Sequence, residues 1–175
     1  SALRCPEHKA WVAARSAEIA ADASDDLLLR CFAWAVLVEI HRNADALAAL
    51  LWCLEGSVSA FPCPQRFDPP PEPALAPQVA RAAALRAVRA VPLAQAFDHV
   101  AKIVDAGSLA SYTWDALTVL GCFGRSERAA EASHTLARFV VAKRRMREFY
   151  DMVGVAVRAI GRLGVPQTDL LLAEM

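Results

Sequence analysis

The chain has 175 residues, which is room for one domain with a hydrophobic core or about four helical hairpins. Its 19 basic residues balance its 19 acidic ones, which argues against a protein that holds nucleic acid mainly through overall charge but leaves a local basic patch open. The most apolar stretch, Leu27 to Ile40, is interrupted by Arg30 and Glu39 and falls short of the roughly 18 apolar residues that a membrane span needs, so no membrane contact is expected.

Hydrophobic residues make up 56% of the chain and its mean hydropathy is +0.29, which is high for a soluble domain. We therefore expect surplus apolar surface to meet protein partners or further repeats of a longer chain. The cysteines are odd in number and several lie in apolar helical surroundings, which indicates reduced, buried thiols in a cytosolic or matrix compartment. They are Cys5, Cys31, Cys53, Cys63 and Cys122.

Residues 1–61 are predicted to form an N-terminal helical hairpin region. After a polar lead-in and a short helix, Ser24 is expected to cap a helix that is apolar on nearly every side from Leu27 to Ile40 and is therefore central. Ala44 to Leu54 is expected to be its antiparallel partner, because the link between the two helices is short.

Residues 62–77 contain seven prolines and are predicted to be an extended linker or an exposed loop. Residues 78–175 are predicted to form a helical-repeat region. Its first two helices are expected at Gln78 to Ala90 and Leu93 to Asp105, and its last at Asp169 to Met175, after Pro166 breaks the chain.

Two copies of one pattern, Ser111 to Gly124 and Asp151 to Gly164, begin forty residues apart in the repeat region. Apolar residues at i, i+4, i+8 and i+11 form one stripe on an α-helix, so each copy is predicted to be a helix with one buried face. The final glycine of each copy is expected to end its helix in a left-handed conformation. The matching apolar residues are Tyr112, Ala116, Leu120 and Phe123 in the first copy and Met152, Ala156, Ile160 and Leu163 in the second.

Ser126 to Met146 is predicted to be a second amphipathic helix, capped by Ser126, so the repeating unit is a helical hairpin. A hairpin cannot bury its apolar face alone, and a period of this length is typical of stacked helical pairs. The predicted fold is therefore all-α, with antiparallel helical hairpins stacked as an α-solenoid. The alternative is that the two copies are not a repeat and that their pattern recurs by chance in a chain rich in alanine and leucine.

The string YTWDALTVLGCFGRSERAAEA, at residues 112–132, resembles a pentatricopeptide repeat, and GRLG followed by LLLAEM is similar to the same pattern. The resemblance covers Leu109 to Met175, and the forty-residue period is nearer to the related octotricopeptide type. It implies an α-solenoid that acts on RNA or within ribonucleoprotein assemblies, mostly in mitochondria or plastids. The positions that would read a base hold Trp114 and Gly154, which do not suit hydrogen-bonded base recognition, so sequence-specific reading is not expected.

No catalytic or metal-binding constellation is evident. Cys5 and His8 have a ligand-like spacing, but structural zinc needs four ligands and no second close pair exists. His41, His99 and His134 lie on separate predicted helices, and the glycines of the repeat do not follow a strand as a phosphate loop requires. We expect neither an enzyme nor a cofactor or metal.

The one concentrated charge feature is the set Lys143, Arg144, Arg145 and Arg147, which closes the second helix of the hairpin. Positive charge there either complements the helix dipole or contacts RNA phosphates, with Phe149 or Tyr150 nearby to stack on bases.

The sequence leaves two hypotheses for the function. The first is a non-catalytic component of an organellar ribonucleoprotein, expected in the mitochondrial matrix and otherwise in the cytoplasm. The second is a scaffold that binds protein only.

Overall fold

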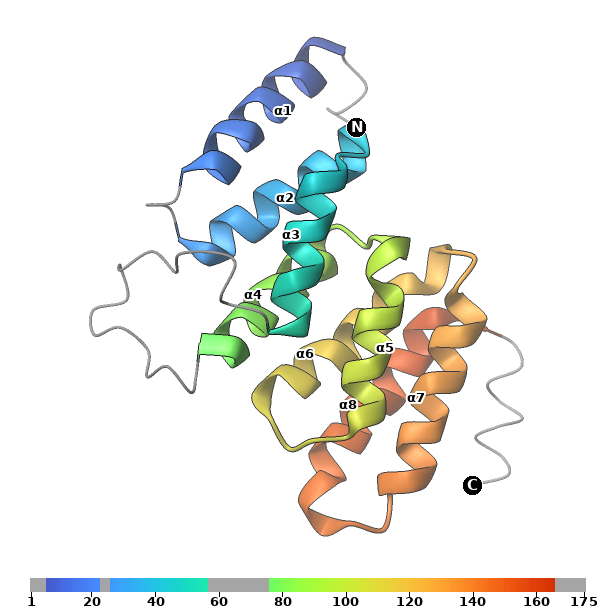
Figure 1. Ribbon diagram of the computed structural model, residues 1–175. Helices are drawn as coiled ribbons and strands as arrows, with labels where there is room; N and C mark the ends of the chain where they lie inside the picture. Colours follow the sequence, from blue (N-terminus) through green and yellow to red (C-terminus); the bar gives the residue numbers. More distant parts are fainter. Residues whose placement is uncertain (1–5, 23–25, 57–75, 166–175) are drawn as a thin grey trace. The chain divides into compact units, whose positions relative to one another are not determined.

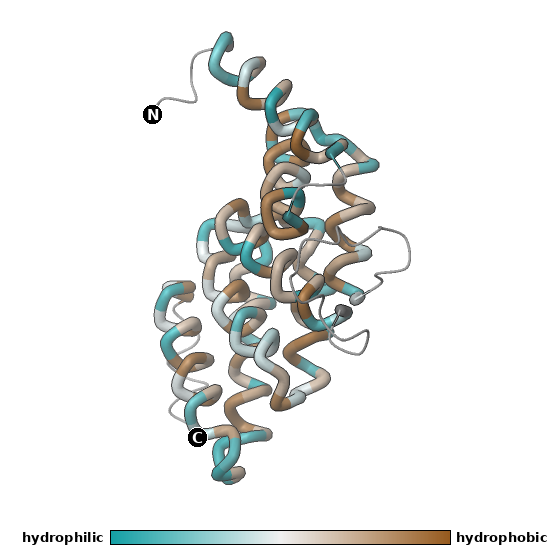
Figure 2. Tube along the Cα trace, turned by 90° about the vertical axis from the view of Figure 1, so that its left-hand side faces the viewer, coloured by the Kyte–Doolittle hydropathy of each residue, from teal (hydrophilic) through white to brown (hydrophobic). Residues whose placement is uncertain are grey.

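The structure is a computed structural model that describes residues 6–22, 26–56 and 76–165 (Figure 1). Throughout these ranges all regular secondary structure is helical, which confirms the predicted all-α class. The chain divides into two compact units, Ser1–Leu93 and Ala94–Met175. Along the described helices apolar and polar positions are interspersed (Figure 2).

The first unit is built around α2 (Leu27–His41), which packs on α1 (Pro6–Ala21), α3 (Ala44–Glu55) and α4 (Ala76–Ala90). Residues on several sides of α2 are buried, which confirms the central place expected from its all-round apolar character. Leu50 and Leu54 of α3 and Leu85 of α4 are among the fully buried side chains of this core. α1 contributes little, since its exposed Trp11 points its large apolar surface toward solvent.

The caps of the α2–α3 hairpin explain where its helices begin. The carboxylate of Asp26 accepts the backbone N–H of Leu28 at 2.6 Å, so Asp26 is the N-cap of α2. The cap expected at Ser24 lies outside the described residues. Between the helices Arg42 takes a left-handed conformation with φ of 54°, and the Asn43 side chain accepts the N–H of Ala46 at 2.8 Å. The short link and the hairpin are as predicted.

α4 belongs to the first compact unit, whereas the proline content had indicated a division ahead of it. Its buried residues pack on α2 and α3, and the Arg81 guanidinium donates to the carbonyl oxygens of Leu54 at 3.3 Å and Glu55 at 2.7 Å. These bonds satisfy carbonyl groups that the end of α3 leaves open. The boundary between the units therefore follows Leu93. Most of the expected linker, residues 62–77, lies outside the described residues.

The second unit contains two helix pairs. α5 (Phe97–Ala106) packs on α6 (Ser111–Leu120), and α7 (Ala129–Lys143) packs on α8 (Tyr150–Leu163). The two pairs also contact each other: the first helices of the pairs, α5 and α7, are in contact, and so are the second helices, α6 and α8. Short 3₁₀ helices lie before α5, after α6 and before α8: η2 (Ala94–Ala96), η3 (Gly121–Arg125) and η4 (Arg147–Phe149).

The two predicted stripes are buried almost throughout. In α6 and η3 the buried members are Ala116, Leu120 and Phe123, and in α8 all four predicted residues are buried. Tyr112 is the exception, since it is half-buried while its neighbour Thr113 is fully buried. The hydroxyl groups of Thr113 and Ser108 lie 3.1 Å apart in a hydrogen bond, so the buried threonine is satisfied within the turn before α6.

The final glycines of the two copies act differently. Gly164 takes φ of +61° and ends α8 as predicted. Gly124 has no positive φ, so the prediction of a left-handed end at this residue was wrong. α6 instead continues into η3, where a Cβ on Gly124 would lie 3.1 Å from the Cα of Leu163. The glycine is needed there for close approach to α8.

Ser126 was predicted to be the N-cap of the following helix, but it lies three residues before Ala129, where α7 begins, and the N-cap is Arg128. Its hydroxyl donates to the carbonyl oxygen of Phe123 at 2.8 Å and accepts the N–H of Arg128 at 3.2 Å. α7 begins only at Ala129 and ends at Lys143, within the predicted range Ser126 to Met146. The serine therefore caps the turn that leads into α7.

Candidate nucleic-acid interface

The four basic residues of the sequence prediction lie where α7 turns back into α8, and we call Lys143, Arg144, Arg145 and Arg147 the basic turn. Backbone hydrogen bonds order this turn. The N–H of Arg144 donates to Val140 at 2.9 Å, that of Met146 to Lys143 at 2.9 Å, and that of Phe149 to Met146 at 3.0 Å. The side chains are therefore presented from a defined backbone.

Lys143 faces the protein. Its ammonium nitrogen lies 4.4 Å from the centre of the Phe149 ring, which is a cation–π contact. Its Cε also lies 2.9 Å from the place that a Cβ on Gly107 would occupy, so the glycine that ends α5 leaves room for the lysine stem. The cation also sits at the C-terminal end of α7, where the helix dipole favours positive charge.

The three arginines differ in exposure. Arg145 and Arg147 are exposed, whereas Arg144 is half-buried and takes part in other interactions. The structure thus brings two guanidinium groups of the basic turn to the surface of the second unit. Exposed guanidinium groups can form two parallel hydrogen bonds with a phosphate, which an ammonium group cannot.

The two aromatic residues beside the basic turn also differ. Phe149 is 6% exposed and its ring stacks edge-on to Phe139, with centroids 6.2 Å apart, so it is part of the core. Tyr150 is 57% exposed. Of the two residues that the sequence offered for base stacking, Tyr150 is the one with an accessible ring.

Acidic residues limit the positive charge at this place. Glu148 and Asp151 are exposed and follow the basic turn directly. Four basic residues against two acidic ones leave an excess of two positive charges between residues 143 and 151. Such a patch favours a few local phosphate contacts over an extended electrostatic track.

Two further arginines, Arg128 at the N-cap of α7 and Arg138 within α7, join the helix pairs, and sequence reasoning missed both. Arg128 bonds Asp98 at 2.6 Å and Glu131 at 2.7 Å, and its guanidinium carbon lies 4.2 Å from the centre of the Phe97 ring. The hydrogen bond to Asp98, followed by that to Glu131, raises the pKa of Arg128 above its ordinary value. No local sequence signal could reveal a partner 30 residues away.

Arg138 makes the second such link. Its guanidinium group donates to both carboxylate oxygens of Asp105, on α5, at 3.0 Å. Together with Arg128 it ties α7 to α5 at two points along the helix. These cations are therefore engaged by carboxylates and do not add to the basic turn.

Cys31 of α2 and Cys53 of α3 form a contact that the sequence analysis did not predict. Both thiols are fully buried, and the hydrogen bond with Cys53, together with burial, raises the pKa of Cys31. Each lies eleven residues from Arg42, the residue at the turn between the two helices. This equal spacing was the sequence signal that could have predicted their contact.

The first unit holds a cavity of 360 Å³ between α1, α2 and α3. Arg30, which is 6% exposed, lies at its wall with its guanidinium carbon 5.1 Å from the centre of the Trp34 ring. Asn43 also lines the cavity, but its side-chain oxygen already caps α3. The buried cation is thus placed by stacking on an aromatic ring.

The other sequence candidates show no common site. His41 and His134 are exposed and His99 is half-buried, on α2, α7 and α5 respectively, and Cys5 and Cys63 lie outside the described residues. Within residues 6–22, 26–56 and 76–165 no three His, Cys, Asp or Glu residues come together in a way that could hold a metal ion. None of the helices described there has both the length and the apolar character to cross a membrane.

Comparison of the chain with protein-family models, with curated proteins and with solved structures gives no match.

Proposed function

We propose that the protein is a non-catalytic helical-repeat component of a ribonucleoprotein assembly that contacts RNA backbone and protein. The contacts of α5 with α7 and of α6 with α8 support equivalent layers of an α-solenoid in the second unit. The resemblance of residues 109–175 to pentatricopeptide and octotricopeptide repeats supports an RNA-associated role in an organelle, with the mitochondrial matrix as the proposed compartment.

The exposure of Arg145 and Arg147 on an ordered turn, beside the exposed ring of Tyr150, is the observation that carries the RNA contact. Guanidinium groups that reach phosphates position an RNA strand without reading its sequence, and an accessible tyrosine stacks on any base. Lys143 supports the turn from inside through the Phe149 ring. Base-specific recognition has no counterpart in this arrangement.

The charge excess sets the expected strength of binding. Two or three phosphate contacts give a slope of log affinity against log salt of about −1.4 to −2.1 for a single strand. Such binding is weak at physiological salt, so protein contacts within the assembly must hold the chain in place.

The test is binding of a fluorescent single-stranded oligouridine of about 20 nucleotides, followed by anisotropy at low salt. We expect the double variant Arg145→Glu, Arg147→Glu to lose about tenfold or more of the affinity. The matched control is Arg158→Glu, Arg162→Glu, which makes the same charge change at two exposed arginines of α8. Unchanged affinity in the first variant with an intact circular dichroism spectrum, or equal loss in both, would contradict the RNA contact.

A scaffold that binds protein only is the second candidate, and exposed apolar side chains favour it. Trp114 on α6 and Val157 on α8 are both more than one-third exposed, on two helices that pack together. Large apolar groups on one pair of helices are typical of protein-binding surfaces. Recovery of a stoichiometric protein partner that survives nuclease treatment, without loss on mutation of the basic turn, supports this candidate against the first.

A further inference from the structure

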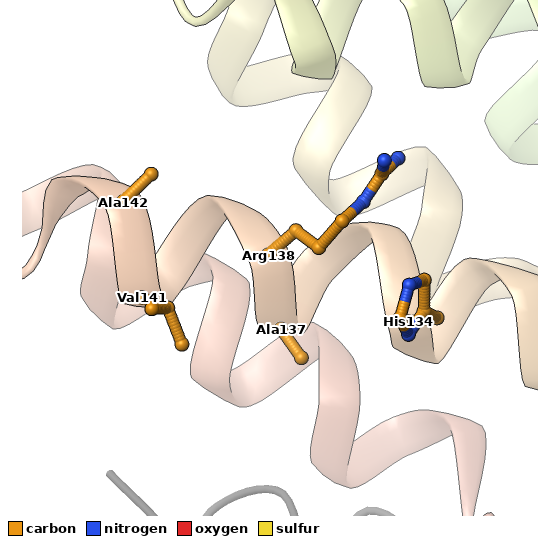
Figure 3. A pocket seen from close by; sticks show the side chains of 5 residues that line it. All are labelled: His134, Ala137, Arg138, Val141 and Ala142. Atoms are coloured by element: carbon orange, nitrogen blue, oxygen red, sulfur yellow. The ribbon is translucent and has the colours of Figure 1, made fainter.

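The hollow of 250 Å³ on α7 has its cation already engaged. His134 at its edge is exposed, and the Arg138 side chain extends away from Ala137 and Val141 (Figure 3). Both carboxylate oxygens of Asp105 accept hydrogen bonds from the Arg138 guanidinium. The two thiols between α2 and α3 differ from these groups, because they are buried and contact each other.

Cys31 of α2 and Cys53 of α3 meet across the helical hairpin of the first unit. Both are free thiols, 0% and 1% exposed, and their side chains are hydrogen-bonded to each other. Cys31 lies near the start of α2 and Cys53 near the end of α3. Two sulfur atoms in hydrogen-bond contact can reach the S–S distance of about 2.05 Å by side-chain rotation and a small shift of the helices.

The surroundings make the two thiols unequal. The hydrogen bond with Cys31 lowers the pKa of Cys53, and the nearby charge of Arg30 acts in the same direction against the effect of burial. The same hydrogen bond, together with burial, raises the pKa of Cys31. Cys53 is therefore the sulfur that favours the nucleophilic thiolate form, while Cys31 keeps its proton.

The position of Cys53 in the last turn of α3 gives an oxidant a way in. This turn ends at Gly56, whose N–H donates to the carbonyl oxygen of Cys53 at 3.0 Å. The Arg81 guanidinium, from α4, holds the turn closed through the carbonyl oxygens of Leu54 and Glu55. Ends of helices open locally at a lower free energy than the whole fold, so opening here exposes Cys53 while the rest of the hairpin stays folded.

We propose that Cys31 and Cys53 form a redox switch, in which a peroxide that enters through the last turn of α3 drives formation of a disulfide between α2 and α3. The Cys53 thiolate attacks one oxygen of the peroxide, so an S–O bond forms, the O–O bond breaks and hydroxide leaves. The Cys31 sulfur then attacks the Cys53 sulfur, the S–O bond breaks, and the hydroxyl group leaves as water with the Cys31 proton. The two thiols lose two electrons, and hydrogen peroxide becomes two water molecules once the hydroxide takes up the proton that Cys53 released.

The disulfide fixes one end of the α2–α3 hairpin. α4 packs on both of these helices, so the crosslink holds together the surface on which α4 rests. A small thiol such as glutathione returns the pair to its reduced form by thiol–disulfide exchange. The switch is therefore reversible and independent of the RNA contact.

The test uses the full chain with Cys5, Cys63 and Cys122 replaced by serine, so that only the pair remains. The chain is treated with hydrogen peroxide, its remaining thiols are blocked with N-ethylmaleimide, and its peptides are mapped by mass spectrometry. We expect a peptide in which Cys31 and Cys53 are joined, lighter than its two parts by two hydrogen atoms. Glutathione should restore both thiols.

Single substitutions in this chain test the order of the two steps. In Cys31→Ser the reaction stops at the sulfenic acid of Cys53, which dimedone captures. In Cys53→Ser, the matched control, Cys31 stays a thiol over the same time. Capture of Cys31 instead of Cys53, or of both equally, would contradict the assignment of Cys53 as the nucleophile.

The route of access has its own pair of variants. Arg81→Met is expected to form the crosslink about tenfold faster, because it removes the hydrogen bonds that hold the last turn of α3 closed. Arg86→Met, on the same helix, removes an exposed guanidinium and should leave the rate unchanged. Equal rates in the two variants would overturn access through this turn.

Two other results overturn the switch itself. The first is that peroxide leaves both thiols open to N-ethylmaleimide in the unfolded chain. The second is that the crosslinks join different chains, which gel filtration of the oxidised protein detects. Peptide mapping of the chain with all its cysteines gives the same decision if the serine variants fail to fold.

Discussion

Gly121 at the start of η3 lies directly against Ala159 of α8, and a Cβ at Gly121 would stand 2.9 Å from the Cβ of Ala159 and 3.0 Å from its Cα. Real Cβ atoms do not approach each other this closely. The absence of a side chain at Gly121 therefore allows the main chains of the two segments to meet. Together with Gly124 against Leu163, this contact sets how closely η3 packs on α8.

We predict that Gly121→Ala destabilises the second unit by about 1–3 kcal/mol, because the added methyl group has to displace the backbone of α8. Urea unfolding followed by circular dichroism measures the change. Gly161→Ala is the control. Nothing lies within 4 Å of a Cβ at Gly161, inside α8, so alanine there stabilises the helix by up to about 1 kcal/mol. Equal effects of the two substitutions would contradict the close contact.

Arg81 is predicted to hold α4 to the end of α3. Arg81→Met keeps much of the aliphatic stem but removes the hydrogen bonds to the carbonyl oxygens of Leu54 and Glu55. Since hydrogen bonds from a charged donor contribute about 1.5–3 kcal/mol, we expect a loss within that range. Arg86→Met on the same helix removes an exposed guanidinium and is expected to change the free energy of unfolding by less than about 0.5 kcal/mol.

Cys31 is predicted to make stability fall at alkaline pH. Its pKa is raised by the hydrogen bond with Cys53 and by burial, so the folded chain keeps a proton that the unfolded chain releases. Stability is then fully present below the unfolded thiol pKa of about 8.5 and declines above it, by at most about 1.4 kcal/mol per pH unit. Urea unfolding between pH 7 and pH 10 measures the slope.

Cys31→Ala is the matching control for this pH dependence. It lowers stability at neutral pH through the lost contact, but it removes the contribution of this thiol to the alkaline slope. If the slope of stability against alkaline pH is the same with and without Cys31, other groups cause it.

The burial of the two thiols is tested by reaction with a soluble disulfide reagent. We expect half-buried Cys122 to react before the buried Cys31 and Cys53.

Helices were predictable from the sequence because their signals are local. The apolar stripe that ends in Phe123 and the one that ends in Leu163 are both buried, and the α2–α3 hairpin follows from a short link between two apolar segments. Each of these features is decided by residues within a few turns of one another.

Features that depend on contacts between distant segments of the chain were not predicted from the sequence. Gly124 was expected to end a helix, but the main chain of α8 at Leu163, 39 residues further along the chain, requires the glycine instead. Lys143 read as one of four equivalent cations, and only the fold shows its ammonium over the Phe149 ring. In the same way, the prolines before α4 gave no sign that this helix packs on α2 and α3.

The contact between η3 and α8 also bears on how relatives of this chain would be recognised. Most of its core is built from interchangeable aliphatic residues, which can drift together while total volume is kept. Gly121, Gly124 and the small residue at 159 have no such freedom, because main chains meet there. We therefore expect two glycines three residues apart, the first against an alanine of α8 and the second against the main chain of Leu163, to persist in divergent relatives after overall similarity has faded.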